Sequence, residues 1–172
     1  MNDYPDRSFE KIDKADLAHL SDLATECLTD MLYRSKTGQF YSSTDVLMSC
    51  LCQGAAQHFV HTDCGVKDWD VVFFFRTNSL YRFPWRWMGN RDFGPSRFGA
   101  DPDEGQRYSG RRIDVMGRDI PVSHQDGGGQ AVVAYLQRNE GSESSAGFWA
   151  RRPLIALTPG DMRGRVIWEG KA

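Results

Sequence analysis

The sequence predicts an α/β (α+β) protein in which helices flank a mixed central β-sheet. Three observations lead to this fold class: a long amphipathic helical pattern near the N-terminus, a central run of β-branched and aromatic residues, and further short strand patterns that alternate with helical ones. The 172 residues fit one domain, residues 1–172, which can bury a substantial core. A hydrophobic share of 40% and a charged share of 26% are typical of globular proteins and unlike disordered ones.

The first half of the chain is predicted to hold two helices and two strands. Residues 1–13 are polar and are expected to be loose. A helix over 14–34 is indicated by apolar residues at helical spacing, namely Leu17, Leu20, Leu23, Ala24, Cys27 and Met31. The nearly continuous apolar run 46–52 predicts a buried strand, and the composition of 55–60 favours a short helix. Residues 68–75 should form a central strand, because they are apolar on both faces beyond a polar start.

The second half begins with a long segment, 76–110, that lacks a clear periodicity. It is rich in Gly, Pro, Arg and aromatic residues. We expect it to form a long loop, called the excursion 76–110 below, and long loops in compact domains are often functional. Residues 111–117 alternate well enough to predict another strand, which we expect beside strand 68–75, with helices on one side of the sheet. The remaining predicted elements are helices over 130–138 and 144–151 and short strands over 154–157 and 166–168.

The charge of the chain is unevenly distributed. The formal net charge is −2, yet residues 76–112 contain eight arginines and four acidic residues, which gives about +4 there and about −6 elsewhere. This local excess of positive charge favours an anionic ligand.

No apolar run is long enough to span a bilayer, and the first residues are charged throughout, so we expect neither a membrane span nor a secretory signal. Nothing else in the sequence indicates export. The four cysteines are therefore expected to be reduced thiols in a cytoplasmic protein.

Three aspartates form the most informative pattern. Asp68 and Asp70 are two residues apart in a predicted strand, so their carboxylates should point to the same face. Adjacent anions repel one another unless a cation lies between them, and Mg²⁺ prefers such hard oxygen ligands. Asp114, between Ile113 and Val115, is a third candidate at a strand position. The sequence thus indicates a metal site made by Asp68, Asp70 and Asp114.

The same residues carry a resemblance to a known family. Gln53-Gly54-Ala55, a gap of family size, Asp68-Trp69-Asp70-Val71 and then Ile113-Asp114-Val115 resemble the nucleotidyltransferase superfamily that includes DNA polymerase β. The likeness covers roughly residues 45–118, and the sequence around Gly54 and Asp68 also resembles a group of uncharacterised bacterial proteins.

The resemblance implies a nucleotidyltransferase-like fold and a magnesium-dependent transfer of a nucleotidyl group from a nucleoside triphosphate. Asp68 and Asp70 would hold two Mg²⁺ ions on the triphosphate, and Asp114 would help to activate an attacking hydroxyl. The acceptor of the nucleotidyl group, a nucleic acid or a protein, is left open.

Several residues are predicted to bind the nucleotide or its phosphates: Gly54, Ala55, Lys67, Ser96, Arg97 and Arg112. Ala55 departs from the family, which commonly has Ser or Gly there, although backbone N–H groups at the start of the following helix can still attract an anion. The alternative is therefore a catalytically inactive nucleotide or nucleic-acid binding module with the same fold. A purely structural alternative pairs Asp70 with Arg112, and Asp114 with Arg111 or Arg118.

Other patterns have simpler interpretations. The aromatic residues that alternate with arginines in 76–110 are predicted mainly to pack on the sheet, although such a mixture can also bind phosphates and bases. A zinc site would use residues from one crowded segment, namely Cys50, Cys52, His58, His61 and Cys64, but their spacing favours buried thiols in a strand. Residues 127–129, three glycines, are predicted to be a flexible entry to a helix.

Overall fold

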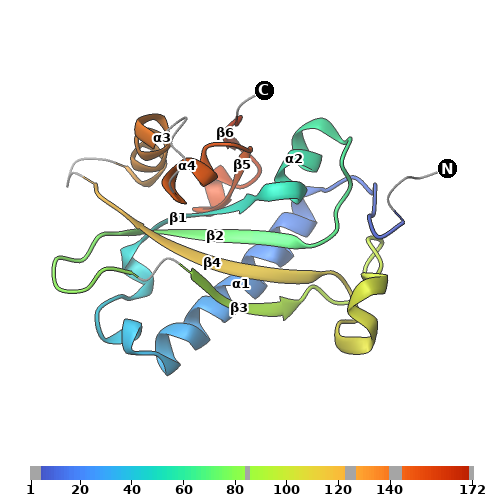
Figure 1. Ribbon diagram of the computed structural model, residues 1–172, viewed down its shortest axis with the longest axis horizontal. Coiled ribbons are helices and arrows are strands. Elements are labelled where there is room, and N and C mark those ends of the chain that lie inside the picture. The colour runs from blue at the N-terminus through green and yellow to red at the C-terminus, as the bar shows by residue number, and fades with distance from the viewer. Residues whose placement is uncertain (1–4, 84–85, 123–126, 140–144, 171–172) are drawn as a thin grey trace.

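The computed structural model describes residues 5–83, 86–122, 127–139 and 145–170. Within them a six-stranded sheet runs in the order β3-β4-β2-β1-β5-β6 (Figure 1). β2 and β4 are parallel and the other neighbouring pairs are antiparallel, which confirms the predicted mixed sheet and the predicted neighbours. The strands are β1 (Val46–Cys52), β2 (Trp69–Arg76), β3 (Arg86–Asp92), β4 (Arg112–Ile120), β5 (Leu154–Thr158) and β6 (Val166–Trp168).

The described ranges also contain four α-helices and four short 3-10 helices. The α-helices are α1 (Lys14–Arg34), α2 (Gln53–His61), α3 (Gly128–Asn139) and α4 (Ser145–Trp149). The 3-10 helices are η1 (Lys36–Gln39), η2 (Ser43–Asp45), η3 (Pro102–Arg107) and η4 (Gly160–Met162). In the part of the chain that the structure describes, no helix is both long and apolar enough to cross a membrane.

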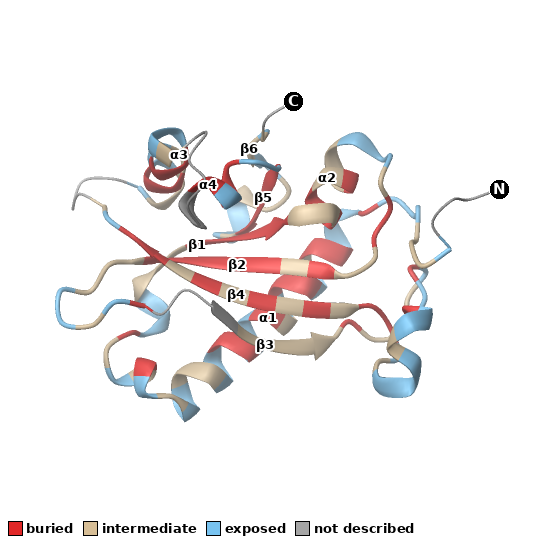
Figure 2. Ribbon diagram, viewed as in Figure 1, coloured by how far each residue is buried: buried red, intermediate tan, exposed pale blue. Residues whose placement is uncertain are grey.

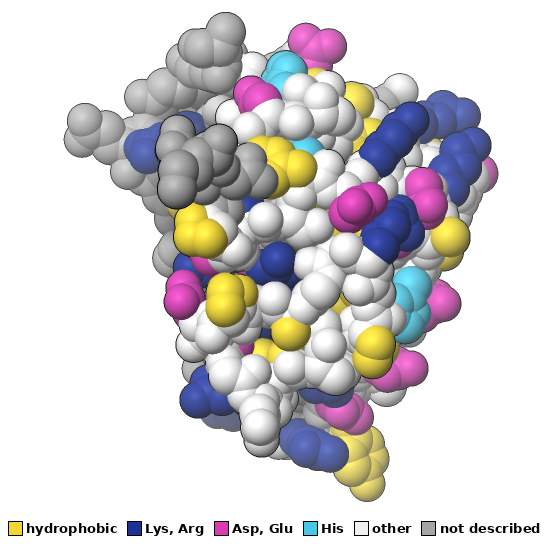
Figure 3. All heavy atoms as spheres, turned by 90° about the vertical axis from the view of Figure 1, so that its right-hand side faces the viewer, with side chains coloured by type: hydrophobic (Ala, Val, Ile, Leu, Met, Phe, Trp, Pro, Cys, Tyr) yellow, Lys and Arg dark blue, Asp and Glu magenta, His cyan; other side chains and the backbone are white. Residues whose placement is uncertain are grey.

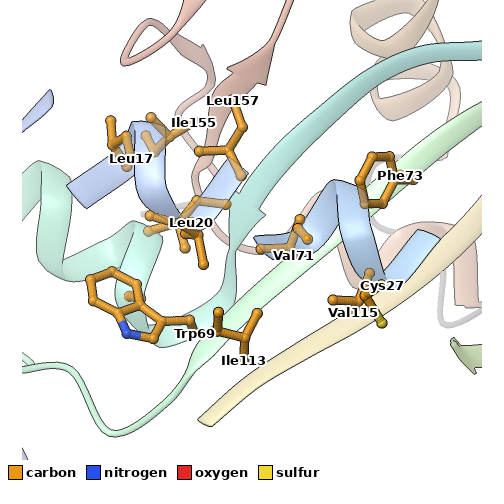
Figure 4. Close-up of a cluster of buried hydrophobic side chains, with 14 of the residues drawn as sticks. Leu17, Leu20, Cys27, Trp69, Val71, Phe73, Ile113, Val115, Ile155 and Leu157 are labelled. Carbon is orange, nitrogen blue, oxygen red and sulfur yellow. The ribbon is translucent and has the colours of Figure 1, made fainter. Parts of the chain in front are cut away.

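One face of the sheet is covered by α1. The helix begins with a capping box, because the Asp13 carboxylate accepts from the Ala15 and Asp16 N–H groups while Asp16 accepts from the Asp13 N–H. Its apolar stripe is buried against the sheet (Figure 4), where the cluster includes Leu17, Leu20, Trp69, Val71, Phe73, Ile113 and Val115. This burial places the start of β2 firmly over the first turns of the helix.

The other face is covered by α3 and α4, so the expectation of helices on one side only is wrong. The core on that face includes Cys50, Val72, Phe74, Val132, Leu136 and Trp149. Residues 71–75 of β2 are all buried (Figure 2), and their side chains alternate between the two faces. A strand that is apolar on both faces therefore needs helices on both sides.

The predicted excursion 76–110 contains a strand, β3, that the sequence does not indicate. Arg86–Asp92 lacks apolar alternation and pairs with β4 at the edge of the sheet through an irregular register. As predicted, several aromatic residues of the segment are core residues: Phe83, Phe93 and Phe98. Trp85 lies outside the described residues, as do the expected loose residues 1–4 and Ser144, the expected start of a helix.

Candidate functional site

The three aspartates lie at one end of the sheet, where β1 ends and where β2 and β4 begin. β1 runs directly into α2, and β2 returns antiparallel to β1, so Cys52 pairs with Asp70. On the other side of β2, Asp70 pairs in register with Asp114 of the parallel strand β4. This end of the sheet is on the right in Figure 1, beside α2 and η3.

Asp70 lies on the face of the sheet that α3 and α4 cover, since Val72 and Phe74 of the same strand belong to that core. Asp68, two residues before Asp70, and Asp114, its neighbour across the strands, share this face. The structure thus brings together the three aspartates that the sequence singles out. All three are half-buried.

Arg112 is the cation that lies among these carboxylates. Its Nη2 is 2.9 Å from Asp114 Oδ2 and 3.4 Å from Asp68 Oδ2, and its Nη1 donates to Glu104 of η3. The purely structural alternative expected Asp70 to pair with Arg112. In the structure Arg112 pairs instead with Asp114, Asp68 and Glu104. A single guanidinium partly neutralises three acidic side chains.

The environment of Asp70 disfavours its charged form. Burial, and then the carboxylates of Asp68 and Asp114, raise the pKa of Asp70 to about 7. Burial and the carboxylate of Asp114 also raise the pKa of Asp68, although Arg112 opposes this shift. The cluster therefore carries more negative charge than Arg112 alone balances, which is the electrostatic condition under which a metal ion stabilises carboxylates.

A cavity of about 290 Å³ opens beside Asp68 and Asp70. Its other walls combine cationic, apolar and backbone groups, contributed by Arg7, Lys67, Arg152, Met116, Phe148, Gln53 and Gly54. Figure 3 shows this end of the molecule, where Lys and Arg side chains lie next to Asp and Glu side chains. The cavity therefore offers carboxylates on one wall and positive charge around them.

The first two residues of α2, Gln53 and Gly54, line this cavity, so the N–H groups of the first turn lie near it. Cys52, the residue before the helix, makes no side-chain hydrogen bond to them, and such N–H groups attract anions. Gln53 has a φ of 57°, a left-handed conformation that costs a non-glycine residue about 1 kcal/mol. A Cβ atom on Gly54 would lie 4.0 Å from Arg7 Nη1, so the guanidinium lies close to the helix start.

Segments distant in sequence hold these cations in place. Ser8 forms an antiparallel bridge with Val66, and Arg7 donates to the Cys64 carbonyl at 2.9 Å. Lys67 Nζ lies 3.0 Å from Asp6 and 3.3 Å from Asp103. The buried Arg111 donates to the carbonyl oxygens of Asp6, Lys67 and Phe98. These contacts fasten residues 6–8, part of the segment expected to be loose, to the site.

The structure distributes the predicted phosphate-binding residues unevenly. Gly54 and Lys67 line the cavity. Arg97 instead pairs with Asp13 at 3.1 Å and with Asp16 at the start of α1, and the Ser96 Oγ accepts from the Phe98 N–H. Ala55 is buried in the core beneath α2. Among its described residues, the excursion 76–110 adds no lining residue to this cavity and approaches the site through Glu104.

Five residues that line the cavity are not among the predicted site residues: Gln53 and Met116, which lie near predicted ones in sequence, and three from distant segments. Arg7 comes from the N-terminal segment, and Phe148 and Arg152 come from α4 and the turn that follows it. No local pattern marks them, because only the tertiary fold brings these segments to the start of β2.

Cysteine and histidine do not form a zinc site among the described residues. Cys50 and Cys52 are buried in β1, as predicted, and all four cysteines are free thiols. His58 is also buried, and its two ring nitrogens are used: Nδ1 accepts from the Gly65 N–H, so Nε2 donates to the Glu10 carbonyl. These residues therefore have structural roles.

The side-chain positions also matter for metal binding at the aspartates. In the ranges that the structure describes, no group of three or more His, Cys, Asp and Glu side chains is placed to hold a metal ion. At the aspartates, Arg112 lies between Asp68 and Asp114. The chain matches no protein-family model, no curated protein and no solved structure, so its function is inferred from this site.

Proposed function

We propose that the protein is a magnesium-dependent nucleotidyltransferase-like enzyme that transfers a nucleotidyl group from a nucleoside triphosphate to an acceptor hydroxyl. The observation that carries the proposal is the pairing of Asp70 with Asp114 across neighbouring strands, where Asp70 and Asp68 line a cavity together with Arg7, Lys67 and Arg152. Two carboxylates on paired strands and a third nearby can share metal ions that also bind phosphate oxygens.

The donor set fits magnesium. Asp68, Asp70 and Asp114 offer only hard oxygen ligands, and the guanidinium of Arg112 already stands in for a cation between Asp68 and Asp114. Glu104 gives Arg112 a partner on its other side, so Arg112 can move away from the aspartates and stay paired. When bound, Mg²⁺ would neutralise charge on the triphosphate and orient it for in-line displacement.

The other walls of the cavity suit the rest of a nucleotide. Arg7, Lys67, Arg152 and the first N–H groups of α2 supply positive charge for the triphosphate. Phe148 is 38% exposed and lines the same cavity, so its ring is available for stacking on a base.

The chemical step needs few groups from the chain. The acceptor hydroxyl oxygen forms a bond to the α-phosphorus, the bond from that phosphorus to the pyrophosphate oxygen breaks, and pyrophosphate leaves. The resemblance to the nucleotidyltransferases assigns the hydroxyl proton to Asp114, and the pairing of Asp114 with Asp70 supports this role by placing it beside the other two aspartates. The acceptor is left open, and nucleic acids and proteins are the acceptors to test.

The second candidate is the nucleotide-binding form of the catalytically inactive nucleotide or nucleic-acid binding module, and Ala55 is the observation that favours it. Its methyl side chain is buried in the core and cannot reach the phosphates as a serine hydroxyl would. Both candidates require nucleotide binding, and only the enzyme turns nucleotide over in the presence of magnesium.

The test is an assay of pyrophosphate release and label transfer with each α-labelled nucleoside triphosphate, with Mg²⁺ or chelator, and with RNA, DNA and protein acceptors. Wild type should release pyrophosphate only with Mg²⁺, and Asp70→Asn should lose at least a hundredfold in rate. Asp22→Asn, on the exposed face of α1, serves as the matched control and should keep wild-type activity. Magnesium-dependent nucleotide binding without turnover would favour the binding module, and neither binding nor turnover would contradict both candidates.

A further inference from the structure

A second cavity, of about 700 Å³, lies at the other end of β1 from the aspartates. Leu47, near the start of β1, forms part of its wall, whereas the aspartates lie beside Cys52 at the end of that strand. The first turns of α3 form a second wall, and the chain from Pro159 to Ile167 forms a third. In Figure 1, α3 lies near β5 and β6, the strands that bound this region.

The three glycines 127–129 shape this cavity. A Cβ atom on Gly128 would lie 2.2 Å from the Leu47 carbonyl oxygen, so only glycine lets α3 begin directly against β1. A Cβ atom on Gly129 would lie 3.3 Å from Met162 Cε, a tight contact. The glycine run therefore brings the helix close to the strand and leaves the adjacent wall without side chains.

The remaining walls are mainly apolar although they are open to solvent. The apolar side chains are those of Leu47, Val133, Ala134, Met162, Val166 and Ile167. Val166, in the edge strand β6, is 43% exposed. A concave apolar surface of this kind, with few polar groups, is typical of sites for small molecules, which measure roughly 300–1,000 Å³.

The polar groups of the cavity select for negative charge. Among the described residues that line the cavity, Arg165 is the one charged residue and none is an aspartate or glutamate. Arg112 and Arg97 are each held by carboxylates. By contrast, within the described ranges the guanidinium of Arg165 makes no ion pair or hydrogen bond. The amide side chains of Gln130 and Gln137 also line the cavity and can donate hydrogen bonds.

We propose that this cavity binds a small amphipathic anion, with its apolar body along Leu47, Val133 and Ile167 and its acidic group at Arg165. The match between an apolar lining and a single unpaired cation identifies the ligand class, since an uncharged apolar ligand would leave Arg165 without a partner. A cationic amphiphile would be repelled by it. The site is separate from the nucleotide site and does not depend on the proposed nucleotidyl transfer.

The experiment uses isothermal titration calorimetry of the full chain with three probes of equal chain length: decanoate, decanol and decyltrimethylammonium, each below its micelle-forming concentration. Decanoate should bind once per chain, and decanol about tenfold more weakly, because it lacks the charged group that pairs with Arg165. Decyltrimethylammonium should show no saturable binding.

Three variants locate the binding. Ala134→Trp, at an exposed position of α3, should remove binding of decanoate and of decanol by filling the cavity. Arg165→Gln should reduce decanoate affinity about tenfold, to the level of decanol, and leave decanol binding unchanged. Ala15→Trp, at an exposed position of α1, is the matched control and should bind as wild type does. Circular dichroism and thermal melts verify that each variant folds.

Several results would overturn the proposal. Absence of saturable decanoate binding, or wild-type binding by a folded Ala134→Trp variant, would show that this cavity is not the site. Equal binding of all three probes, unaffected by Arg165→Gln, would refute selection for an anion. Because Arg165 is exposed, Arg165→Gln should fold and keep the test decisive even where the tryptophan variant does not fold.

Discussion

Replacing Asp70 with asparagine removes one charge from the aspartate cluster and keeps the size of the side chain, so we expect it to stabilise the metal-free protein at alkaline pH. Burial and the neighbouring carboxylates raise the pKa of Asp70 from 3.8 to about 7. One pKa unit corresponds to about 1.4 kcal/mol, so this rise has an upper limit of about 4 kcal/mol. Because Arg112 can move toward the remaining carboxylates and offset part of this penalty, we expect about 2–3 kcal/mol.

The direction of the pH dependence follows from which state holds the proton more tightly. The folded protein binds the Asp70 proton more tightly than the unfolded chain does, so protonation favours folding. This contribution to stability is fully present below about pH 4, the unfolded pKa, and is lost as the pH rises through about 7. Asp70→Asn lacks this loss. The variant should therefore match wild type near pH 4 and exceed it at pH 8.5.

Urea unfolding between pH 4 and 9, followed by the fluorescence of the buried Trp69 and Trp149, measures this difference. Magnesium adds an opposite effect, because it should stabilise wild type at pH 8.5 and stabilise Asp70→Asn much less. Asp22→Asn is the control for loss of an exposed carboxylate. A variant that is less stable than wild type at pH 8.5 without metal, with a wild type indifferent to magnesium and nucleotide, would refute the reasoning.

Four further substitutions test three separate parts of the structure. Arg112→Met should destabilise the metal-free protein by about 2–3 kcal/mol, because it removes the guanidinium that Asp68 and Asp114 share and leaves Glu104 paired with Arg107 at 3.8 Å. Calorimetric titration should show tighter magnesium binding by this variant, and weaker binding would contradict the role of Arg112 as a substitute for the metal cation. Gly128→Ala should lower the free energy of unfolding, measured with urea, by several kcal/mol, because the new Cβ would lie 2.2 Å from the Leu47 carbonyl oxygen. Gly54→Ala should leave this free energy unchanged or raise it by up to about 1 kcal/mol. Equal effects of the two substitutions would refute the predicted contrast. Asp92→Ala should cost about 2–3 kcal/mol at pH 7, because its carboxylate accepts from Ser109, Gly94 and Gly110. Burial opposes ionisation of Asp92, but these hydrogen bonds prevail and lower its pKa to about 2. The difference in free energy of unfolding between wild type and Asp92→Ala should therefore narrow as the pH falls toward 2. A difference that stays constant with pH would contradict this.

Local sequence patterns predicted the central elements well. The bounds of α1 and β1 agree with the expected 14–34 and 46–52, because a buried amphipathic stripe and a continuous apolar run are strong local signals. The pairing of β2 with β4 was predicted from the chemistry shared by Asp70 and Asp114, and the register confirms that these strands are neighbours.

Features that depend on tertiary contacts could not be predicted from local patterns. β3 is held by pairing with β4 and not by its own composition. Helices on both faces follow from the apolar character of both faces of β2. The sequence of that strand therefore contradicts the expectation of helices on one side only. The places of Arg7 and Arg152 in the cavity depend on where segments distant in sequence meet. Arg97 does not line the cavity, because it forms an ion pair with Asp16 at the start of α1.

The most direct test of the proposed function is a crystal structure of the protein with Mn²⁺ and a non-hydrolysable nucleoside triphosphate, in which anomalous scattering locates the metal. We expect Mn²⁺ between Asp68, Asp70 and Asp114, phosphates beside Arg7 and the start of α2, and Arg112 turned toward Glu104. Crystals of Asp70→Asn under the same conditions should show weaker or missing metal peaks. Nucleotide and metal bound elsewhere, or a wild-type site in which Arg112 still bridges Asp68 and Asp114 at saturating metal and nucleotide, would contradict the proposal.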